Sequence, residues 1–263
     1  AGNCAMLKPS ELSPVVSSVL SKLINDHFDK REIACFGGGV EVSEALLDLP
    51  FDHIFFTGSP RVGKIIMAAA ARHLSSVTLE LGGKSPVIIT EDADLDKAAE
   101  KIVWGKYINA GQTCIAPDYV LIDAAVEEEF LRLASAKIDK LFYRDAKLDK
   151  SSYGKIISPG HYQRLKALRD QALADGAVII KGETDYDEDH TIAPVILGKV
   201  SESSAIMQEE IFGPLLPVIT FKSINQAIDI VNQKPKPLAL YIFSDSEPMI
   251  RNIIRKTSSG GTC

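Results

Sequence analysis

Apolar runs and amphipathic runs alternate along the whole chain, separated by clusters of Gly, Pro and Ser. Short apolar runs bounded by such residues predict strands, whereas longer runs with one apolar face predict helices. The pattern predicts strands at 33–36, 53–57, 77–81, 86–89, 119–122, 178–180, 192–196 and 238–243. It predicts helices at 41–48, 62–73, 94–107, 126–141, 161–174, 223–232 and 248–257.

This alternation predicts an α/β fold. Residues 33–81 follow a β-α-β-α-β order, which is typical of a parallel sheet covered by helices. The turn at 82–84 (Gly-Gly-Lys) is the expected joint between two domains, because an active site gains from lying at such a joint. Residues 183–190 are polar and acidic, which indicates a surface loop.

Composition narrows the class of protein. With 263 residues and 46% hydrophobic content, the chain can bury the core of one or two domains. A net charge of -6 argues against a nucleic-acid partner or an anionic membrane. The four cysteines fit neither a zinc site nor a redox pair, so no metal is expected. So few cysteines are typical of a reduced, cytoplasmic protein; an organelle or membrane association of a longer parent stays open.

Cys114 is the first candidate for chemistry. Gly111-Gln112-Thr113 before it and Ala116-Pro117 after it suit an irregular loop that holds one side chain in place. A thiolate in such a loop can attack an electrophilic carbon, and a backbone N–H beside it can face the developing oxyanion. A free cysteine is otherwise packing material, so the spacing alone leaves both roles open.

Glu80 is the second candidate, and it ends the apolar run 77–81 just before two glycines. We expect partial burial of its carboxylate there, which would favour a general base; a carboxylate pointing at water is the alternative. The third candidate is the turn Phe56–Ser59, where a strand meets a helix N-terminus that suits phosphate oxygens. That signal is weak alone, because Val42 replaces the third glycine of a Gly-x-Gly-x-x-Gly pattern.

Together, several segments are similar to the aldehyde dehydrogenase superfamily in order and spacing. The segments are Leu7–Glu11, Phe56–Ser59, Leu79–Pro86, Gly111–Cys114 and Glu209–Pro214. The resemblance covers essentially the whole chain. Ala116–Tyr119 and Lys234–Tyr241 most resemble the class 3 branch, which includes fatty and aromatic aldehyde dehydrogenases.

The resemblance implies an oxidoreductase that oxidises an aldehyde to a carboxylic acid with NAD(P)+. Cys114 matches the nucleophile, which forms a thiohemiacetal and then a thioester, and Glu80 matches the general base. The resemblance implies cofactor-binding roles for Lys8, Glu11, Gly58, Ser59, Val62, Leu81, Gly82, Glu210 and Phe212. It further implies a homodimeric parent enzyme.

Within the cofactor set, Lys8 and Glu11 match the pair that holds the adenosine ribose. A carboxylate accepts from ribose hydroxyls and repels a 2′-phosphate, so Glu11 favours NAD, with NADP as the second choice. Glu210 and Phe212 match the residues that position the nicotinamide ribose and ring.

The family architecture implies a partial, Rossmann-like NAD(P)-binding domain at 1–82 and a partial α/β catalytic domain at 83–263. We expect a fragment, because the chain starts without Met, and the family's oxyanion Asn lies in a segment upstream of Lys8; Asn3 is not that residue. We therefore expect the chain alone to be poorly active.

Two alternatives stay open. In the first, the chain is a catalytically inert fragment that serves as a binding module, which the missing Asn segment favours. In the second, the enzyme is an acylating aldehyde dehydrogenase that passes the acyl group to coenzyme A. Glu80 counts against the second alternative, because that branch needs no water-activating carboxylate.

Overall fold

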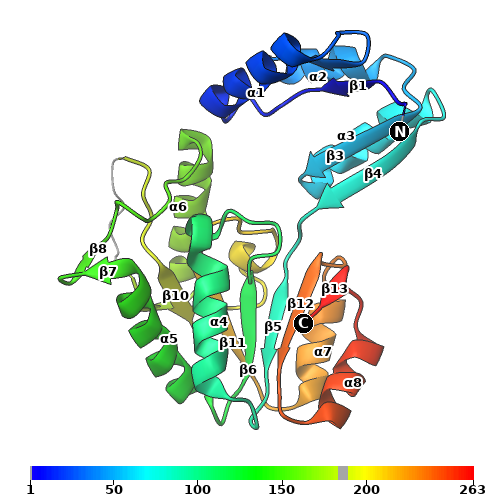
Figure 1. Cartoon of the computed structure of the whole chain (residues 1–263). Helices are drawn as coiled ribbons and strands as arrows, with labels where there is room; N and C mark the ends of the chain where they lie inside the picture. The colour runs from blue at the N-terminus through cyan, green and yellow to red at the C-terminus, as the bar shows by residue number, and fades with distance from the viewer. Residues whose placement is uncertain (1, 183–188) are drawn as a thin grey trace. The chain divides into compact units, whose positions relative to one another are not determined.

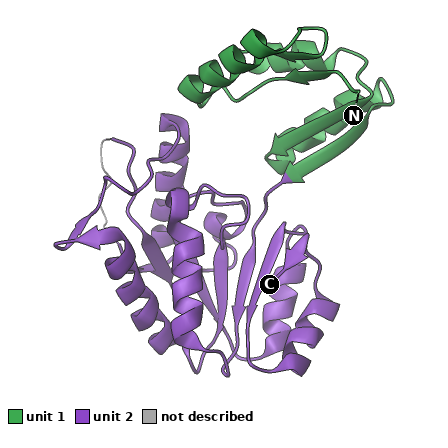
Figure 2. Cartoon of the chain, in the orientation of Figure 1, with its two compact units in different colours: residues 1–80 green, residues 81–263 purple. Residues whose placement is uncertain are grey.

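The computed structural model describes residues 2–182 and 189–263, so most of the loop predicted at 183–190 lies outside the described residues. The chain forms two compact units that divide between Glu80 and Leu81 (Figure 2). Both units mix helices with mostly parallel strands, as the α/β prediction requires (Figure 1). Within the described residues, none of the helices has the length and apolar content that crossing a membrane requires.

The first unit contains two pairs of strands, each joined through a helix. Its strands are β1 (Ala5–Leu7), β2 (Ile33–Cys35), β3 (His53–Gly58) and β4 (Ser76–Leu81). Its helices are α1 (Pro14–His27), α2 (Val40–Leu47) and α3 (Pro60–Ala71). β1 pairs with β2 in parallel across α1, and β3 pairs with β4 across α3, running the same way in Figure 1.

This pairing differs from the single β-α-β-α-β sheet predicted for 33–81. β2 pairs with β1 and not with β3. The difference arises from α1, a crossover helix that was not among the predicted elements. Its apolar residues Val16, Val19, Leu20, Leu23 and Ile24 recur at helical spacing, so the sequence does mark this helix, although no residue of α1 is fully buried.

The second unit is built on one seven-stranded sheet with the order β13-β12-β5-β6-β11-β10-β9. The strands are β5 (Pro86–Ile89), β6 (Tyr119–Asp123), β9 (Val178–Lys181), β10 (Val195–Gly198), β11 (Leu215–Phe221), β12 (Ala239–Phe243) and β13 (Gly261–Thr262). Every neighbouring pair is parallel except β9 with β10. A short antiparallel hairpin, β7 (Tyr143–Arg144) with β8 (Lys147–Leu148), stands apart from this sheet.

Helices cover this sheet, as parallel strands require. The helices are α4 (Leu95–Tyr107), α5 (Glu127–Phe142), α6 (Pro159–Ala174), α7 (Ile224–Asn232) and α8 (Glu247–Lys256). Asp94 caps α4 by accepting the Lys97 N–H at 3.1 Å, and Ser158 caps α6 by accepting the His161 N–H at 3.3 Å. These caps explain why the predicted starts of both helices fall within a few residues of the observed ones.

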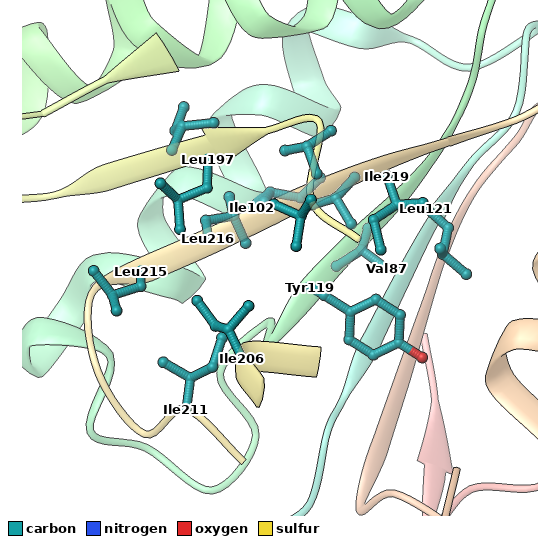
Figure 3. Packing of buried hydrophobic residues seen from close by; sticks show 14 of the residues in the cluster. Val87, Ile102, Tyr119, Leu121, Leu197, Ile206, Ile211, Leu215, Leu216 and Ile219 are labelled. Atoms are coloured by element: carbon teal, nitrogen blue, oxygen red, sulfur yellow. The ribbon is translucent and has the colours of Figure 1, made fainter. Parts of the chain in front are cut away.

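The core of the second unit lies between the central strands and these helices. All residues of β5 and β10 are buried. Figure 3 shows Val87, Leu121 and Ile219, from three adjacent strands, packed with Ile102 of α4. β11, between β6 and β10, was not predicted, because Pro217 in its middle is atypical of a central strand. Its ladder with β6 begins only at Val218, so Pro217 lies outside that ladder.

A charged side chain is enclosed in this core. Lys106, in the last turn of α4, is 1% exposed, and burial lowers its pKa from 10.5 to about 8. Asp118 opposes that effect by attraction, whereas Lys84 adds to it by repulsion. The protonated form of Lys106 therefore costs free energy in the folded state.

The central position of Leu121 predicts a large cavity cost. Leu121→Ala, at a fully buried site of β6, should lower the free energy of unfolding by about 2–5 kcal/mol. The control Leu141→Ala, in α5 and 44% exposed, should change it by about 1 kcal/mol or less. Urea unfolding followed by circular dichroism measures both, and equal losses would mean that the core does not centre on β6.

The depressed pKa of Lys106 predicts a stability difference that depends on pH. Below about pH 8 the folded protein carries the buried charge, so Lys106→Met should be more stable than the parent by about 3 kcal/mol. The advantage should shrink as pH rises through about 8 and vanish near pH 10.5, where the free lysine also loses its proton. Unfolding curves at several pH values measure this difference. For the control Lys101→Met, on an exposed side of α4, the difference in free energy of unfolding from the parent should be the same at every pH. A difference for Lys106→Met that is likewise the same at every pH would contradict the prediction.

Candidate active site

The loop that carries Cys114 has an unusual backbone. It begins in the 3-10 turn η1 (Ile108–Gly111), where Asn109 and Ala110 both have φ of 52° and Gly111 has φ of 74°. Such left-handed conformations are costly for residues other than glycine, so the surrounding contacts must hold them. A Cβ at Gly111 would collide with the carbonyl of Gly213, so glycine allows these two backbones to touch.

Gln112 ties this loop to another part of the unit. Its Nε2 donates to the Asn109 carbonyl at 3.1 Å and to the Lys155 carbonyl at 2.9 Å. Its Oε1 accepts the N–H of Ile157 at 2.9 Å. The Gln112 side chain therefore links the loop to residues 155–157 by hydrogen bonds, and its role is to position the loop.

The Cys114 thiol is exposed at the turn that follows. Ala116 N–H donates to the Thr113 carbonyl at 3.0 Å, and the Tyr241 hydroxyl donates to the Ile115 carbonyl at 2.6 Å. The backbone is thus fixed on both sides of a side chain that solvent can reach. Burial raises the pKa of Tyr241, and the Cys263 and Cys114 thiols nearby add to this rise.

An apolar cavity of about 580 Å³ lies beside this loop. Thr113 and Ile115, the two neighbours of Cys114 in sequence, line it together with Trp104, Ile108 and Phe243. An apolar cavity next to an accessible nucleophile suits an uncharged organic substrate.

The segment that contains Glu210 and Phe212 lies against the same loop through the Gly111–Gly213 contact. The Glu210 carboxylate lies directly against Gly82, where no Cβ would fit. Burial raises the pKa of Glu210, whereas the backbone N–H of Gly83 lowers it. Phe212 is half-buried with a left-handed φ of 49°. The structure thus brings Gly82, Glu210, Phe212 and the Cys114 loop together in the second unit.

Two buried charges lie behind this segment. The Lys84 ammonium contacts the Asp118 carboxylate, and their side chains are 6% and 4% exposed. Lys84 also donates to the carbonyls of Ile206 and Glu209, and Asp118 accepts the N–H of Ile211 at 2.9 Å. Lys84 and Asp118 stand in the motifs of the sequence, but sequence reasoning gave neither a role.

In the first unit, the structure brings Lys8 and Glu11 together. The Lys8 ammonium lies 3.0 Å from a Glu11 carboxylate oxygen and 3.1 Å from the Pro9 carbonyl. The backbone N–H of Glu11, and then Lys8, hold the pKa of the Glu11 carboxyl below its usual value. Glu41 is a neighbour that sequence reasoning missed: Glu11 lies near enough to raise the pKa of its carboxyl, and Lys8 near enough to lower it.

The turn of Gly58 and Ser59 also takes the predicted form. Ser59 is the N-cap of α3, and its hydroxyl accepts the Val62 N–H at 3.4 Å. A Cβ at Gly58 would collide with the ring of Phe56. The N-terminus of α3 carries a partial positive charge, which suits a phosphate group.

Glu80 differs from its expected environment. The expectation of partial burial is wrong: Glu80 is exposed at the end of β4, and Leu81 after it is half-buried. The reason is that β4 belongs to a sheet of only two strands, which leaves this face open. The role of Glu80 as general base stays a prediction.

Sequence reasoning missed the cations that surround the Glu210 segment. Arg164 of α6 donates to the carbonyls of Glu210 and Ile211, at 3.2 and 2.5 Å, and Lys234 donates to the Met207 carbonyl at 2.7 Å. Lys106 of α4 lies in the same charged environment. These contacts join residues far apart in the chain, so no local pattern marks them. Among the described residues, none of the groups of three or more His, Cys, Asp or Glu suits a metal ion.

Comparison with known proteins agrees with this arrangement. The family model "Aldehyde dehydrogenase family" matches residues 1–263. Human aldehyde dehydrogenase family 3 member B1 is 45% identical over 263 residues, which are 100% of this chain and 55% of that protein. The rat "Aldehyde dehydrogenase, dimeric NADP-preferring" is 45% identical over 261 residues, which are 99% of this chain and 56% of that protein.

A solved structure described as the substrate-bound state of Staphylococcus aureus AldH superposes with a TM-score of 0.95 at 43% identity. The match covers 100% of this chain and 56% of that one. The chain therefore spans about half the length of the curated relatives it matches. Because the family match runs from the first residue to the last, the chain belongs to the aldehyde dehydrogenase family.

Proposed function

We propose that the protein oxidises an aldehyde to a carboxylic acid with NAD(P)+, with Cys114 as nucleophile. The observation that carries the proposal is the exposed Cys114 thiol on a rigid, left-handed loop packed against the segment of Glu210 and Phe212. Family membership supports the reaction class. A reactive side chain on a fixed backbone beside an apolar cavity is what nucleophilic catalysis on a small organic substrate requires.

The residues present suit a nicotinamide dinucleotide. The ionised Glu11 can accept hydroxyl groups of a ribose, and the N-terminus of α3 suits the pyrophosphate. The half-buried carboxylate of Glu210 can accept from the second ribose, with Phe212 next to it. When bound, the nicotinamide supplies the hydride acceptor. Glu11 and its neighbour Glu41 disfavour a 2′-phosphate, which favours NAD; the name of the rat relative keeps NADP as the second choice.

The proposed reaction runs through Cys114. Its thiolate attacks the aldehyde carbon, and the backbone N–H of Cys114 stabilises the oxyanion of the thiohemiacetal. Loss of hydride from that carbon leaves a thioester on Cys114. Glu80 then accepts a proton from water as the water attacks, the C–S bond breaks, and the acid leaves with the thiolate restored. The word "dimeric" in the name of the rat relative supports a homodimer.

Cys114→Ser should remove nearly all NADH production, by about 1,000-fold or more, because a hydroxyl is a far weaker nucleophile than a thiolate near neutral pH. The absorbance of NADH measures the rate in the protein that carries this chain. Cys4→Ser replaces another exposed cysteine and should keep the parent rate. A Cys114→Ser enzyme with more than about a tenth of the parent rate would refute the nucleophile assignment.

Glu80→Gln should uncouple hydride transfer from hydrolysis. The variant should produce one equivalent of NADH per active site and then stall, because the thioester lacks the base that activates water. Rapid mixing followed by NADH absorbance measures the burst, and Glu32→Gln, at an exposed site of the same unit, is the control. A normal steady rate would remove Glu80 from the base role. Recovery of turnover on adding coenzyme A, with a thioester product, would instead support the acylating alternative.

A further inference from the structure

The segment 206–212 is held largely without regular secondary structure. It leaves the 3-10 turn η2 (Ala205–Met207) and reaches β11 only at Leu215. Its two isoleucines, Ile206 and Ile211, are fully buried and lie near one another in the core (Figure 3). Glu209 and Glu210 lie between these two apolar anchors, where the backbone needs other partners.

Lys84 supplies partners on one side of Glu210. Its ammonium group donates to the Ile206 carbonyl at 2.8 Å, to the Glu209 carbonyl at 3.0 Å and to the Asp118 carboxylate. An ammonium group has three N–H donors, so these three contacts use all of them. Lys84 also lies 5.4 Å from the centre of the Tyr119 ring, which favours its charge.

Asp118 supplies the partner on the other side. One of its carboxylate oxygens contacts Lys84, and the other accepts the Ile211 N–H at 2.9 Å. The backbone N–H of Asp118 donates to the Ser85 carbonyl at 2.8 Å, which ties the pair to the starts of β5 and β6. The peptide groups on both sides of Glu210 are thus bound by one buried ion pair.

The same pair also reaches the nucleophile loop. Asp118 comes four residues after Cys114, at the point where the loop enters β6. Gly111, at the other end of the loop, touches Gly213 of the segment. The position of Cys114 relative to Glu210 and Phe212 therefore depends on the ion pair and on the Gly111–Gly213 contact, beside the bonds that Arg164 donates to the carbonyls of Glu210 and Ile211.

We propose that Lys84 and Asp118 are positioning residues, which set Glu210 and Phe212 relative to Cys114 for hydride transfer. The inference rests on the proposed function. A buried ion pair adds little net stability compared with apolar side chains of the same size, whereas its hydrogen bonds fix direction. The pair is therefore better explained by the fixed position that it gives to the backbone of residues 206–211 than by any stability that it adds.

The test is the double variant Lys84→Met with Asp118→Asn. It removes both charges of the pair together, so that the attraction of Asp118 and the repulsion of Lys84 on Lys106 are lost at once, and the Asn oxygen can still accept the Ile211 N–H, so the fold should survive. The carbonyls of Ile206 and Glu209 lose their donor. We expect NAD to bind about tenfold more weakly in fluorescence titration, and the single-turnover hydride-transfer rate to fall about tenfold. Alkylation of Cys114 by iodoacetamide should stay within about twofold of the parent.

The control is Lys137→Met, which breaks an ion pair with Asp96 on the helix surface and touches neither loop. It should leave NAD affinity and the hydride-transfer rate unchanged. Equal losses in the control and the double variant would overturn the proposal, and so would parent-like NAD affinity and hydride transfer in the double variant. Should the double variant fail to fold, Lys84→Arg, which keeps the buried charge pair but alters the bonds to the carbonyls of Ile206 and Glu209, should weaken NAD binding about threefold, and no change there would also overturn the proposal.

Hydrogen exchange separates this inference from the proposed function. The amides of residues 208–213 should exchange about tenfold faster in the double variant, while those of β5 and β6 keep the parent rate. If the parent protein neither binds NAD nor forms NADH, the proposed function fails, and faster exchange would still support the positioning of the segment. If exchange in 208–213 is unchanged, the ion pair does not hold the segment and the inference fails by itself.

Discussion

The buried contact between Lys84 and Asp118 is the constraint on which the arrangement of the second unit's site depends. Two charges shielded from water destabilise the fold unless each is paired and fully hydrogen-bonded. Here every donor of Lys84 and both oxygens of Asp118 have partners: one donor and one oxygen bond to each other, and the rest bond to backbone groups of Ile206, Glu209 and Ile211. The backbone of residues 206–211 must therefore lie beside the ion pair in one orientation. The irregular path of that segment follows from this requirement.

The parallel direction of the strands decides which loops can share such a contact. Lys84 precedes β5, Asp118 precedes β6, and Phe212 precedes β11. Because these strands are parallel, their starts meet at one edge, and the candidate site of this unit lies there. In open α/β sheets, ligands usually bind at the opposite edge, beyond the carboxyl ends of the strands.

Sequence patterns anticipated the parts of the fold that local chemistry determines. β5 matches its predicted bounds because an apolar run marks it, and α4 starts within one residue of its predicted start because the acidic cap Asp94 marks it. β11 was not predicted, because Pro217 is atypical of a central strand, and α1 was missed although its apolar residues recur at helical spacing. For the site, the sequence predicted an irregular loop at Cys114 and, separately, a pair formed by Lys8 and Glu11. The left-handed backbone at Asn109 depends on contacts between distant residues and leaves no local pattern.

At Cys114 the side chain is exposed while the backbone is held in place, and this difference explains the composition of its loop. A nucleophile must be reachable, so its side chain cannot be held by burial, and its backbone must be held instead. Gln112 binds carbonyls on two segments, Gly111 permits contact with Gly213, and Tyr241 binds the carbonyl of Ile115. Each of these residues contacts the backbone of the loop and leaves the thiol exposed. The residues that surround a catalytic cysteine can thus be identified by what they do to the main chain, even where none of them touches the sulfur.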